Sequence, residues 1–233
     1  MADEQAFRVG RHDVTLVLRD GVGPPTPYSL LLAEHIPQLE GGTAVDLGSG
    51  SGFLAIVARL QGAASVYLLD TNAQAVALSL ENAERNGVRE GMVPLATGAA
   101  MLPLPDGERV DLIISNPAQL PLPERDREDS PFYAGPDGRS MIEGLLREAP
   151  DRLAPGGRLV MTHNSLTDFP RSLKMMQSAG LEPRVLAERK LAFRPFIDRA
   201  WIDHLGGVQH GLYELRDGVP TETLYVVEAR SPA

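Results

Sequence analysis

The sequence contains no cysteine among its 233 residues. Disulfide bonds are therefore impossible, and zinc sites built on cysteine thiolates are excluded. The absence fits a reducing compartment, and we expect the protein in the cytoplasm. Histidine is also scarce, with five in the chain. His204 and His210 fall in an irregular C-terminal stretch without the spacing of a ligand set, so we predict no metal.

Long hydrophobic runs are missing as well. No apolar segment approaches the ~20 residues that a membrane-spanning helix requires. The N-terminal residues include Asp3 and Glu4 and lack the apolar core of a secretory signal. We therefore expect no membrane partner. The length of the chain suits one well-packed α/β domain with a small added lobe.

The sequence has fewer positively charged than negatively charged residues. The 22 lysines and arginines face 31 aspartates and glutamates, which leaves a formal net charge of −9. An acidic domain repels a phosphate backbone, so nucleic acid is disfavoured as a partner. A locally basic segment, residues 184–199, either forms a solvated face or holds an anionic group of the substrate.

Segments with strand character alternate with segments of helical periodicity from about residue 44 onward. This alternation predicts an α/β fold, with a doubly wound, mostly parallel, seven-stranded sheet and helices on both faces. One helix begins at Pro27 with Thr26 as its cap, because proline tolerates the first helical position. The expected strands are residues 44–47, 66–70, 92–96, 111–115, 158–162, 184–191 and 223–229.

The order of these segments predicts two regions. Residues 1–40 form an N-terminal arm, with a short hairpin within residues 7–22, followed by a gate helix. Residues 41–233 form the core, which an irregular insertion interrupts at about residues 193–220. Residues 117–137 make a long, proline-bearing, charged loop directly after a strand. Loops of this length in compact domains usually serve function.

The strongest local signal is the glycine-rich turn Val-Asp-Leu-Gly-Ser-Gly-Ser-Gly at residues 45–52. It follows a buried strand and precedes a helix, and glycine lets the backbone turn sharply and approach a ligand closely. The next strand ends at Asp70, whose carboxylate can accept from both hydroxyls of a ribose. The turn and Asp70 together predict a nucleoside-binding site.

The glycine spacing separates two classes of nucleoside cofactor. Nicotinamide-binding folds use G-x-G-x-x-G, whereas this chain has Gly48, Gly50 and Gly52, followed by Phe53 and preceded by Asp46. This pattern resembles that of the class I S-adenosylmethionine-dependent methyltransferases, which have a Rossmann-like fold. The resemblance implies that the turn holds the amino-acid half of S-adenosyl-L-methionine. A nicotinamide oxidoreductase stays as a distant alternative.

On this resemblance, the cofactor-binding residues lie at several neighbouring strand ends. They are Asp46, Gly48, Ser49, Gly50, Gly52, Asp70, Thr71, Thr97, Gly98 and Asn116. Many family members carry an acid after the glycine of the third strand end, where it accepts from the adenine amino group. Here Ala99 stands in that place, so adenine recognition falls to backbone groups or to a nearby side chain.

A second motif, Asn116-Pro117, ends the fourth core strand. Ligands of parallel α/β sheets lie beyond the carboxyl ends of the strands, and proline fixes the preceding residue in an extended conformation. The Asn116 amide oxygen and a nearby carbonyl can then accept from a planar NH2 group and orient its nitrogen toward the methyl donor. We therefore expect Asn116 and Pro117 to be catalytic, with an ordinary turn asparagine as the alternative.

The wider sequence resembles the release-factor glutamine methyltransferases and their relatives that act on amino groups, whose motif is Asn-Pro-Pro-Tyr or Asn-Pro-Pro-Phe. The likeness covers about residues 22–192. It includes the Gly-x-Asp-Gly element of residues 135–139, the turn of residues 153–157 and the proline-containing gate of residues 25–28. The resemblance implies a glutamine or another amino group as the acceptor.

The chain departs from that family directly after the Asn-Pro pair. Ala118 and Gln119 stand where the family has proline and an aromatic ring that stacks on the flat acceptor group. Another ring, from Phe132, Tyr133 or Trp201, would have to replace it. The residues expected to contact the substrate are Tyr28, Gln119, Tyr133 and Trp201.

His163 lies at the predicted end of the fifth core strand, near the expected site. Histidine titrates near neutral pH and can serve as a general base when the nucleophile starts protonated. We therefore add His163 to the candidate catalytic residues. A hydrogen-bonded structural histidine is the alternative, and the neighbouring Asn164 has the same two interpretations.

Three functions follow from these residues. The preferred one is methylation of a polar atom, first of all a nitrogen, on a small metabolite, with residues 7–22 and 193–220 roofing the pocket. The altered motif, the acidic charge and the extra C-terminal segment favour it. A glutamine or amino group on a protein partner is the second candidate acceptor. The third function uses the cofactor without methyl transfer, either in intramolecular chemistry or only as a bound ligand.

Overall fold

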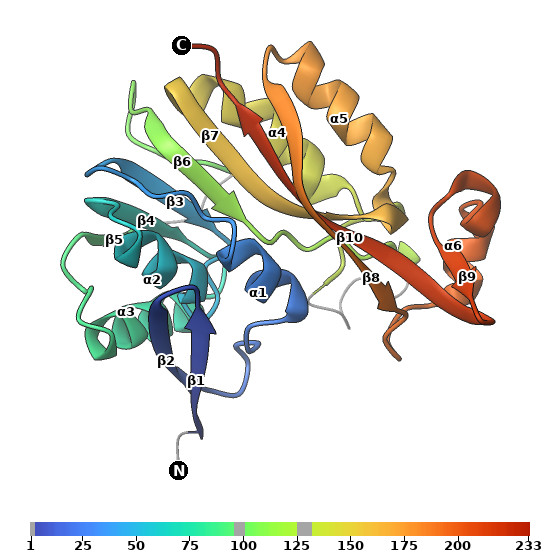
Figure 1. The fold of residues 1–233 in the computed structure, drawn as a ribbon, viewed down its shortest axis with the longest axis horizontal. Helices are drawn as coiled ribbons and strands as arrows, with labels where there is room; N and C mark the ends of the chain where they lie inside the picture. The colour runs from blue at the N-terminus through green and yellow to red at the C-terminus, as the bar shows by residue number, and fades with distance from the viewer. Residues whose placement is uncertain (1–2, 96–100, 125–131) are drawn as a thin grey trace.

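A central sheet with helices on both faces forms the body of the protein, in a computed structural model that describes residues 3–95, 101–124 and 132–233 (Figure 1). The strand order is β5-β4-β3-β6-β7-β10-β8, and β9 pairs with β10. Strands β5, β4, β3, β6 and β7 run parallel, while β10 is antiparallel to both β7 and β8. The expected α/β fold with a mostly parallel sheet is therefore confirmed.

The strands of this sheet agree with the sequence prediction except for short shifts at their ends and the unpredicted β9. They are β3 (Thr43–Leu47), β4 (Ser65–Leu69), β5 (Met92–Pro94), β6 (Val110–Ser115), β7 (Leu153–Asn164), β8 (Glu182–Ala192), β9 (Glu214–Arg216) and β10 (Val219–Arg230). The turn expected at residues 153–157 lies inside β7, where the register against β6 shifts between Val110 and Leu112. β7 therefore bulges at its glycines instead of beginning after them.

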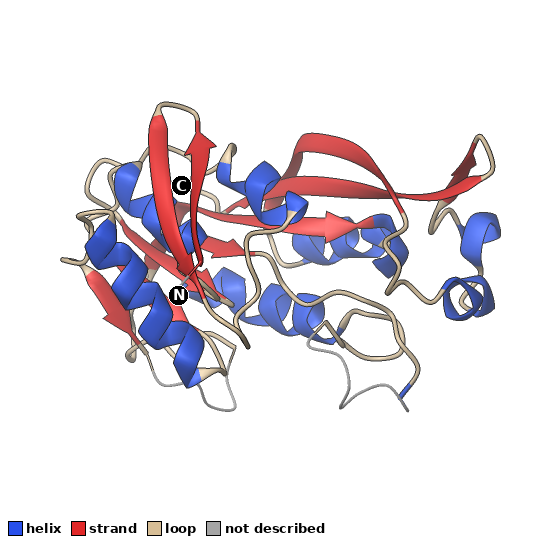
Figure 2. Ribbon diagram, turned by 90° about the horizontal axis from the view of Figure 1, so that it is seen from below, coloured by secondary structure: helices blue, strands red, loops and turns tan. Residues whose placement is uncertain are grey.

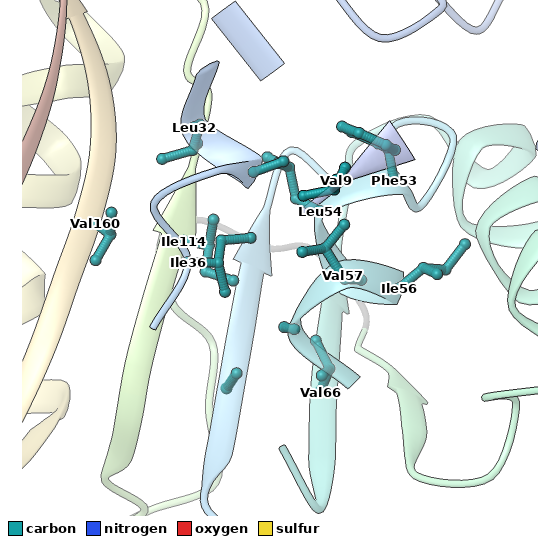
Figure 3. Packing of buried hydrophobic residues seen from close by; sticks show 14 of the residues in the cluster. Val9, Leu32, Ile36, Phe53, Leu54, Ile56, Val57, Val66, Ile114 and Val160 are labelled. Atoms are coloured by element: carbon teal, nitrogen blue, oxygen red, sulfur yellow. The ribbon is translucent and has the colours of Figure 1, made fainter. Parts of the chain in front are cut away.

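Helices cover the two faces of the sheet and create two separate cores. They are α1 (Pro27–Ala33), α2 (Phe53–Leu60), α3 (Ala73–Arg85), α4 (Ser140–Arg152), α5 (Phe169–Ser178) and α6 (Arg199–His204). Leu32 and Val57 of the first helices pack with Ile114 and Val160 of the sheet (Figure 3). Leu145 of α4 belongs to the core of the opposite face. Side chains that alternate along a strand therefore enter different environments.

Each helix that leads to the site begins with a recognisable local signal. The Thr26 side chain accepts from the Ser29 N–H, and the Ser29 hydroxyl accepts from the Thr26 N–H, which completes the capping box of α1. This confirms the predicted start at Pro27. Helix α3 has a simpler cap, in which the Asn72 side chain accepts from the Gln74 N–H. α2 has Gly52 at its cap and lacks a side-chain cap.

The N-terminal arm is a hairpin of β1 (Asp3–Val9) and β2 (His12–Leu18). It begins earlier than the predicted residues 7–22, and it packs on α2 and α3 (Figure 2). The expectation that it roofs the pocket is therefore wrong, because its apolar face is already used against these helices. Among the described residues, no helix is long and apolar enough to cross a membrane.

Two asparagines of α3 serve as the hydrogen-bonding edge for β2. Asn82, which is fully buried, accepts from the Val17 N–H at 2.8 Å and donates to the Val17 carbonyl at 3.1 Å. Asn86 bonds the N–H and carbonyl of Thr15 in the same way. A helix thus satisfies the outer edge of a strand, which otherwise needs a neighbouring strand.

Replacement of Asn82 by alanine should destabilise the protein by about 2–4 kcal/mol, because several buried backbone groups lose their partners at once. The matched variant Asn86→Ala should cost less, since water reaches that half-buried position. Urea unfolding followed by circular dichroism measures both. Equal losses for the two variants would contradict this account of the hairpin.

Candidate active site

The glycine turn between β3 and α2 combines one packed position with two open ones. Gly48, Gly50 and Gly52 all have positive φ, of 81°, 52° and 81°. A Cβ atom at Gly52 would lie 2.8 Å from the Ser79 Cα atom of α3, whereas one at Gly48 would meet nothing within 4 Å. The third glycine is therefore required by packing, and the first leaves room for a ligand to approach the backbone.

Asp70 ties the turn to the end of β4. Its carboxylate accepts from the Gly50 N–H and from the Asn72 N–H, both at 2.9 Å. The Leu69 carbonyl accepts from the N–H groups of Gly48 and Ser49. The predicted neighbours Gly50 and Asp70 are thus in contact, and the half-buried carboxylate keeps lone pairs available for hydroxyl donors.

Asp46 lies below the turn, with no exposed surface. One carboxylate oxygen accepts from the Ala55 N–H of α2 at 3.0 Å, and the other has no partner within the described protein. Burial raises the pKa of Asp46 from 3.8 to about 7, against the Ala55 hydrogen bond and with help from the charge of Asp70. The acid therefore caps the first turn of α2, where Gly52 offers no side chain.

A cavity of about 270 Å³ opens beside the turn and extends along the sheet edge. Gly48 and Gly50 line it together with Asn116 and Pro117. The remaining walls combine polar, aromatic and aliphatic side chains: Thr26, Tyr28, Ala118, Gln119, Leu120, Phe132, Asn164, Arg194, Phe196, Ile197 and Glu222. The open glycine backbone and the adjacent carboxylates fit the nucleoside and amino-acid groups of S-adenosylmethionine.

Asn116 is held in one orientation by its neighbours. The Thr162 hydroxyl donates to its amide oxygen at 2.7 Å, and its amide nitrogen donates to the Ser29 hydroxyl at 3.1 Å. The amide oxygen retains a second lone pair, which faces no other donor among the bonds described. Asn116 can therefore accept from an NH2 group in the cavity without breaking either contact.

Gln119 occupies the position where the resembling family has an aromatic ring, but its side chain forms hydrogen bonds within the protein. It is buried, donates to the Thr162 hydroxyl at 3.1 Å and accepts from the Asn164 N–H at 2.8 Å. These bonds point the Thr162 hydroxyl at Asn116. The expected contact between Gln119 and substrate is limited to the wall that it forms, since its polar atoms are engaged with the protein.

Besides the predicted Tyr28, two rings line the cavity: Phe132, which the sequence offers as a replacement ring, and Phe196, which it does not single out. Phe132 and Phe196 stack with a centroid distance of 5.3 Å and an interplanar angle of 15°. Both line the cavity and both are partly exposed. The predicted Tyr133 instead bonds Glu124, and Trp201 donates to the Pro136 carbonyl. Neither Tyr133 nor Trp201 lines the cavity.

His163 does not face the cavity, so its predicted role as a base is wrong. It alternates with Thr162 and Asn164 along β7 and points to the α5 side, where it packs on Phe169. One ring nitrogen bonds the Asn164 carbonyl and the other bonds the Ser172 hydroxyl, each at 2.8 Å. Burial lowers the pKa of His163 to about 3. The structural interpretation of this histidine therefore holds.

The remaining predicted cofactor residues lie at the edges of the site or outside it. Thr71 is exposed after β4, and Ser49 is buried within the turn. Thr97 and Gly98 lie outside the described residues. Tyr28, predicted from the gate, does line the cavity from the first turn of α1.

The Gly-x-Asp-Gly element supports the loop that follows Asn116. Gly138 has a φ of +70°, and a Cβ atom there would lie 2.7 Å from the Pro121 nitrogen. Arg139 is almost fully buried and donates to the carbonyls of Thr167 and Asp168. This element therefore positions the acceptor loop from behind and touches no part of the cavity wall.

No sequence motif marks Glu222, and Arg194 stands out in the sequence only as one of several basic residues. Glu222 belongs to an antiparallel strand far from every motif, so no local pattern marks it. The available signal is a single charged residue among apolar and neutral ones, in the sequence Val-Pro-Thr-Glu-Thr-Leu. A charge on the inward face of a buried strand is unusual unless it has a partner or a ligand.

Comparison with known proteins adds independent findings. A family model described as "Methyltransferase small domain" matches residues 27–182. A protein of Methanocaldococcus jannaschii named "Putative protein N5-glutamine methyltransferase" is 27% identical over 81% of this chain and 95% of its own length. The ribosomal protein L11 methyltransferase of Vibrio cholerae is 35% identical, over 69% of this chain and 45% of the relative.

Further relatives share only part of their length with this protein. The release factor glutamine methyltransferase of Geobacter sulfurreducens is 32% identical over 66% of this chain and 51% of its own. The chain thus spans about half the length of the L11 and release-factor relatives. A solved T. thermophilus 16S rRNA N2 G1207 methyltransferase, in complex with AdoMet and guanosine, has the same fold, with a TM-score of 0.62, 19% identity and coverage of 98% of this chain and 50% of that one.

Replacement of Asp46 by asparagine should stabilise the protein increasingly as the pH rises. The carboxyl has a higher pKa in the folded than in the unfolded chain, so its contribution to stability is lost between about pH 4 and pH 7. Asparagine keeps an acceptor for the Ala55 N–H and does not titrate. The difference in unfolding free energy between variant and wild type should grow by up to about 4 kcal/mol over this range.

Urea titrations at several pH values test this difference. Neutral His163 gains stability with rising pH over much of the same window, because its folded pKa lies below its ordinary value. This opposite pH dependence from His163 is the same in wild type and in the Asp46→Asn variant. It therefore cancels in the difference between their unfolding free energies. A difference that stays constant from pH 4 to pH 8 would show that Asp46 is ionised throughout.

Proposed function

The chain belongs to the methyltransferase small domain family of S-adenosylmethionine-dependent enzymes, and we propose that it transfers the methyl group to a nitrogen atom held at Asn116. The cofactor supplies an electrophilic methyl group on a sulfonium sulfur. The protein's part is to align the acceptor nitrogen with that carbon and to exclude water. An uncharged amine nitrogen needs no base before it attacks. The N–C bond forms as the S–C bond breaks, the cofactor leaves as the neutral thioether, and the methylated nitrogen then gives its proton to solvent.

We assign the cofactor to the glycine turn and the strand ends beside it. Gly48 and Gly50 offer open backbone to the amino-acid half, and Asp70 offers a carboxylate to the ribose hydroxyls. Asp46 has an unpaired oxygen beneath the turn, which favours a positively charged group nearby. These are the same residues that the sequence singled out.

The orientation of Asn116 carries the proposal of nitrogen as the methylated atom. Its amide is fixed on both sides, by Thr162 and Ser29, at the boundary between the glycine turn and the rest of the cavity. An amide oxygen with a free lone pair selects an N–H donor over an acceptor group. The lone pair of a nitrogen that donates there does not lie along the N–H···O line, so it stays available to attack the methyl carbon.

Two acceptor classes have separate support. The name of the Methanocaldococcus relative, and that of the release-factor relatives, favours the side-chain amide of a glutamine in a protein. The cavity favours a small molecule, because Glu222 and Arg194 add charged groups to the same cavity that Asn116 lines. The stacked Phe132 and Phe196 rings suit a flat amide or amidine group in either class.

Binding of S-adenosylmethionine and of its demethylated product should raise the melting temperature, whereas NAD should not. The variant Gly48→Ala should weaken both ligands by about tenfold or more, because its methyl group enters the cradle. Gly41→Ala is the matched control: it has a φ of +84°, near the 81° of Gly48, and equally open space. Both variants should lose similar stability, about 1–2 kcal/mol, but the control should keep its ligand response.

Replacement of Asn116 by alanine should lower turnover about a hundredfold and leave the affinity for S-adenosylmethionine within about twofold. The assay follows tritium from the methyl group into either the protein fraction or the small-molecule fraction of a lysate from the source organism. Asn86→Ala, far from the cavity, is the control. An equal loss of affinity and turnover would contradict Asn116 as the acceptor grip, and release of methylthioadenosine would contradict methyl transfer.

A further inference from the structure

Three side chains that line the cavity have buried polar atoms without hydrogen-bond partners in the protein. The Tyr28 hydroxyl, the Arg194 Nε atom and both carboxylate oxygens of Glu222 are buried and make no hydrogen bond within the described structure. All three residues line the same cavity. Buried polar groups in folded proteins nearly always have partners, so a cluster of three indicates a ligand that supplies them.

Of the three residues, Glu222 has the largest free-energy cost of burial without a partner. Its side chain has no exposed surface, and an ionised carboxylate pays a large desolvation penalty in such a place. Burial raises its pKa, and the neighbouring Tyr28 phenol and then the Arg194 charge oppose that shift. Burial also raises the pKa of the Tyr28 phenol, and the charge of the adjacent Glu222 adds to that shift. The phenol oxygen and the carboxylate nevertheless have no hydrogen bond of ordinary geometry.

Arg194 is stacked on two aromatic rings. Its guanidinium carbon lies 4.9 Å from the centroid of Tyr28 and 4.5 Å from that of Phe196. Stacking of this kind holds the planar cation in place without using its N–H donors. Arg194 and Glu222 therefore bring opposite charges to one cavity. Among the salt bridges of the described residues, none joins the two.

The strand register places Glu222 some distance from Asn116. Asn116 follows β6, Asn164 ends β7 and pairs with Leu224 of β10, and Glu222 lies two residues before Leu224. Residues two apart on a strand share a face, so these side chains all project to the α1 side. One strand separates β6 from β10, which sets the two backbones roughly 10 Å apart. A single small molecule can span from Asn116 to Glu222.

We propose that the acceptor is a small zwitterion of the amino-acid type, whose ammonium group binds Glu222, whose carboxylate binds Arg194, and whose reacting nitrogen lies at Asn116. This proposal rests on the proposed nitrogen methylation and names its substrate class. The ligand pairs both buried charges at once, and Tyr28 can donate to its carboxylate. The Phe132 and Phe196 rings then cover the part of the molecule between the charges and the reacting nitrogen.

A glutamine within a protein satisfies this site less well. Its backbone nitrogen and carbonyl belong to neutral peptide bonds, so it brings neither an ammonium nor a carboxylate to the cavity. Glu222 would then stay unpaired in the complex, which costs affinity. The charge of the acceptor therefore separates the two classes that the proposed function leaves in competition.

The test compares two probe mixtures on protein saturated with demethylated cofactor. One is an equimolar mixture of the twenty free L-amino acids, and the other contains the same amino acids as Nα-acetyl amides, which carry identical side chains and no main-chain charge. The free mixture should raise the melting temperature, and the blocked mixture should not. With labelled S-adenosylmethionine, tritium should enter one component of the free mixture only.

Charge-neutral variants identify the residues. Glu222→Gln and Arg194→Gln should each weaken the response to the free mixture by about tenfold or more, while affinity for the demethylated cofactor stays within about twofold. Glu188→Gln and Arg189→Gln, exposed on β8, remove the same charges elsewhere and should change neither. Glu222→Gln should be at least as stable as wild type, because it removes a desolvated charge.

Several outcomes would overturn the proposal. Response to neither mixture, or to both alike, contradicts recognition of a zwitterion. Loss of cofactor affinity in the Glu222 and Arg194 variants would assign the pair to the methionine end of the cofactor instead. Methylation of a protein fraction, with no response to free amino acids, would leave the proposed nitrogen methylation intact and reject this substrate class. Destabilisation by Glu222→Gln would show a structural role.

Discussion

The clamp that α3 places on the glycine turn is the constraint on which the rest of the site depends. Gly52 packs against the Ser79 backbone with no room for a Cβ atom. The Ser79 hydroxyl donates to the Gly50 carbonyl, and Asn82 donates to the Ser51 carbonyl. One helix thus fixes the shape of the turn, and the turn in turn fixes the start of α2. The same Asn82 anchors the N-terminal hairpin, so the arm and the cofactor turn share a support.

The sheet edge is divided into a part formed by local sequence and a part assembled from distant segments. The glycine turn and Asp70 come from two consecutive strand–helix units and touch directly. The acceptor side combines α1, the loop after β6, the end of β8 and the start of β10. Polar groups on the first side are mostly satisfied by the backbone, whereas Glu222 and Arg194 on the second side are not. This difference in hydrogen bonding marks the side of the site where we expect the acceptor to bind.

Two buried carboxylates show how position decides the consequence of burial. Asp46 lies at the N-terminus of α2, where a backbone N–H and the helix dipole partly offset its desolvation. Glu222 has no such support, and the nearest positive charge is held against aromatic rings. Burial raises the pKa of both. Of the two carboxylates, only that of Glu222 lines a cavity in which a positively charged group can bind.

The sequence by itself determined the fold class, the cofactor turn and the Asn-Pro motif, because each depends on contacts between residues close in the chain. Glycine spacing, capping residues and strand periodicity are local properties, and Thr26, Gly52 and Asp70 lie where these properties predicted. The departure at Gln119 was also visible, although its effect on Thr162 was not. Thr162 lies 43 residues later in the chain, and only the pairing of β6 with β7 brings the two together.

Tertiary structure alone decided which face His163 adopts and which charges meet in the cavity. A shift of one position along a strand reverses the face of a side chain, so a histidine one residue from the site points into the opposite core. Glu222 and Arg194 are brought to Tyr28 by an antiparallel pair of strands and a short helix far apart in sequence. No spacing rule links such residues, since the folded sheet sets their proximity.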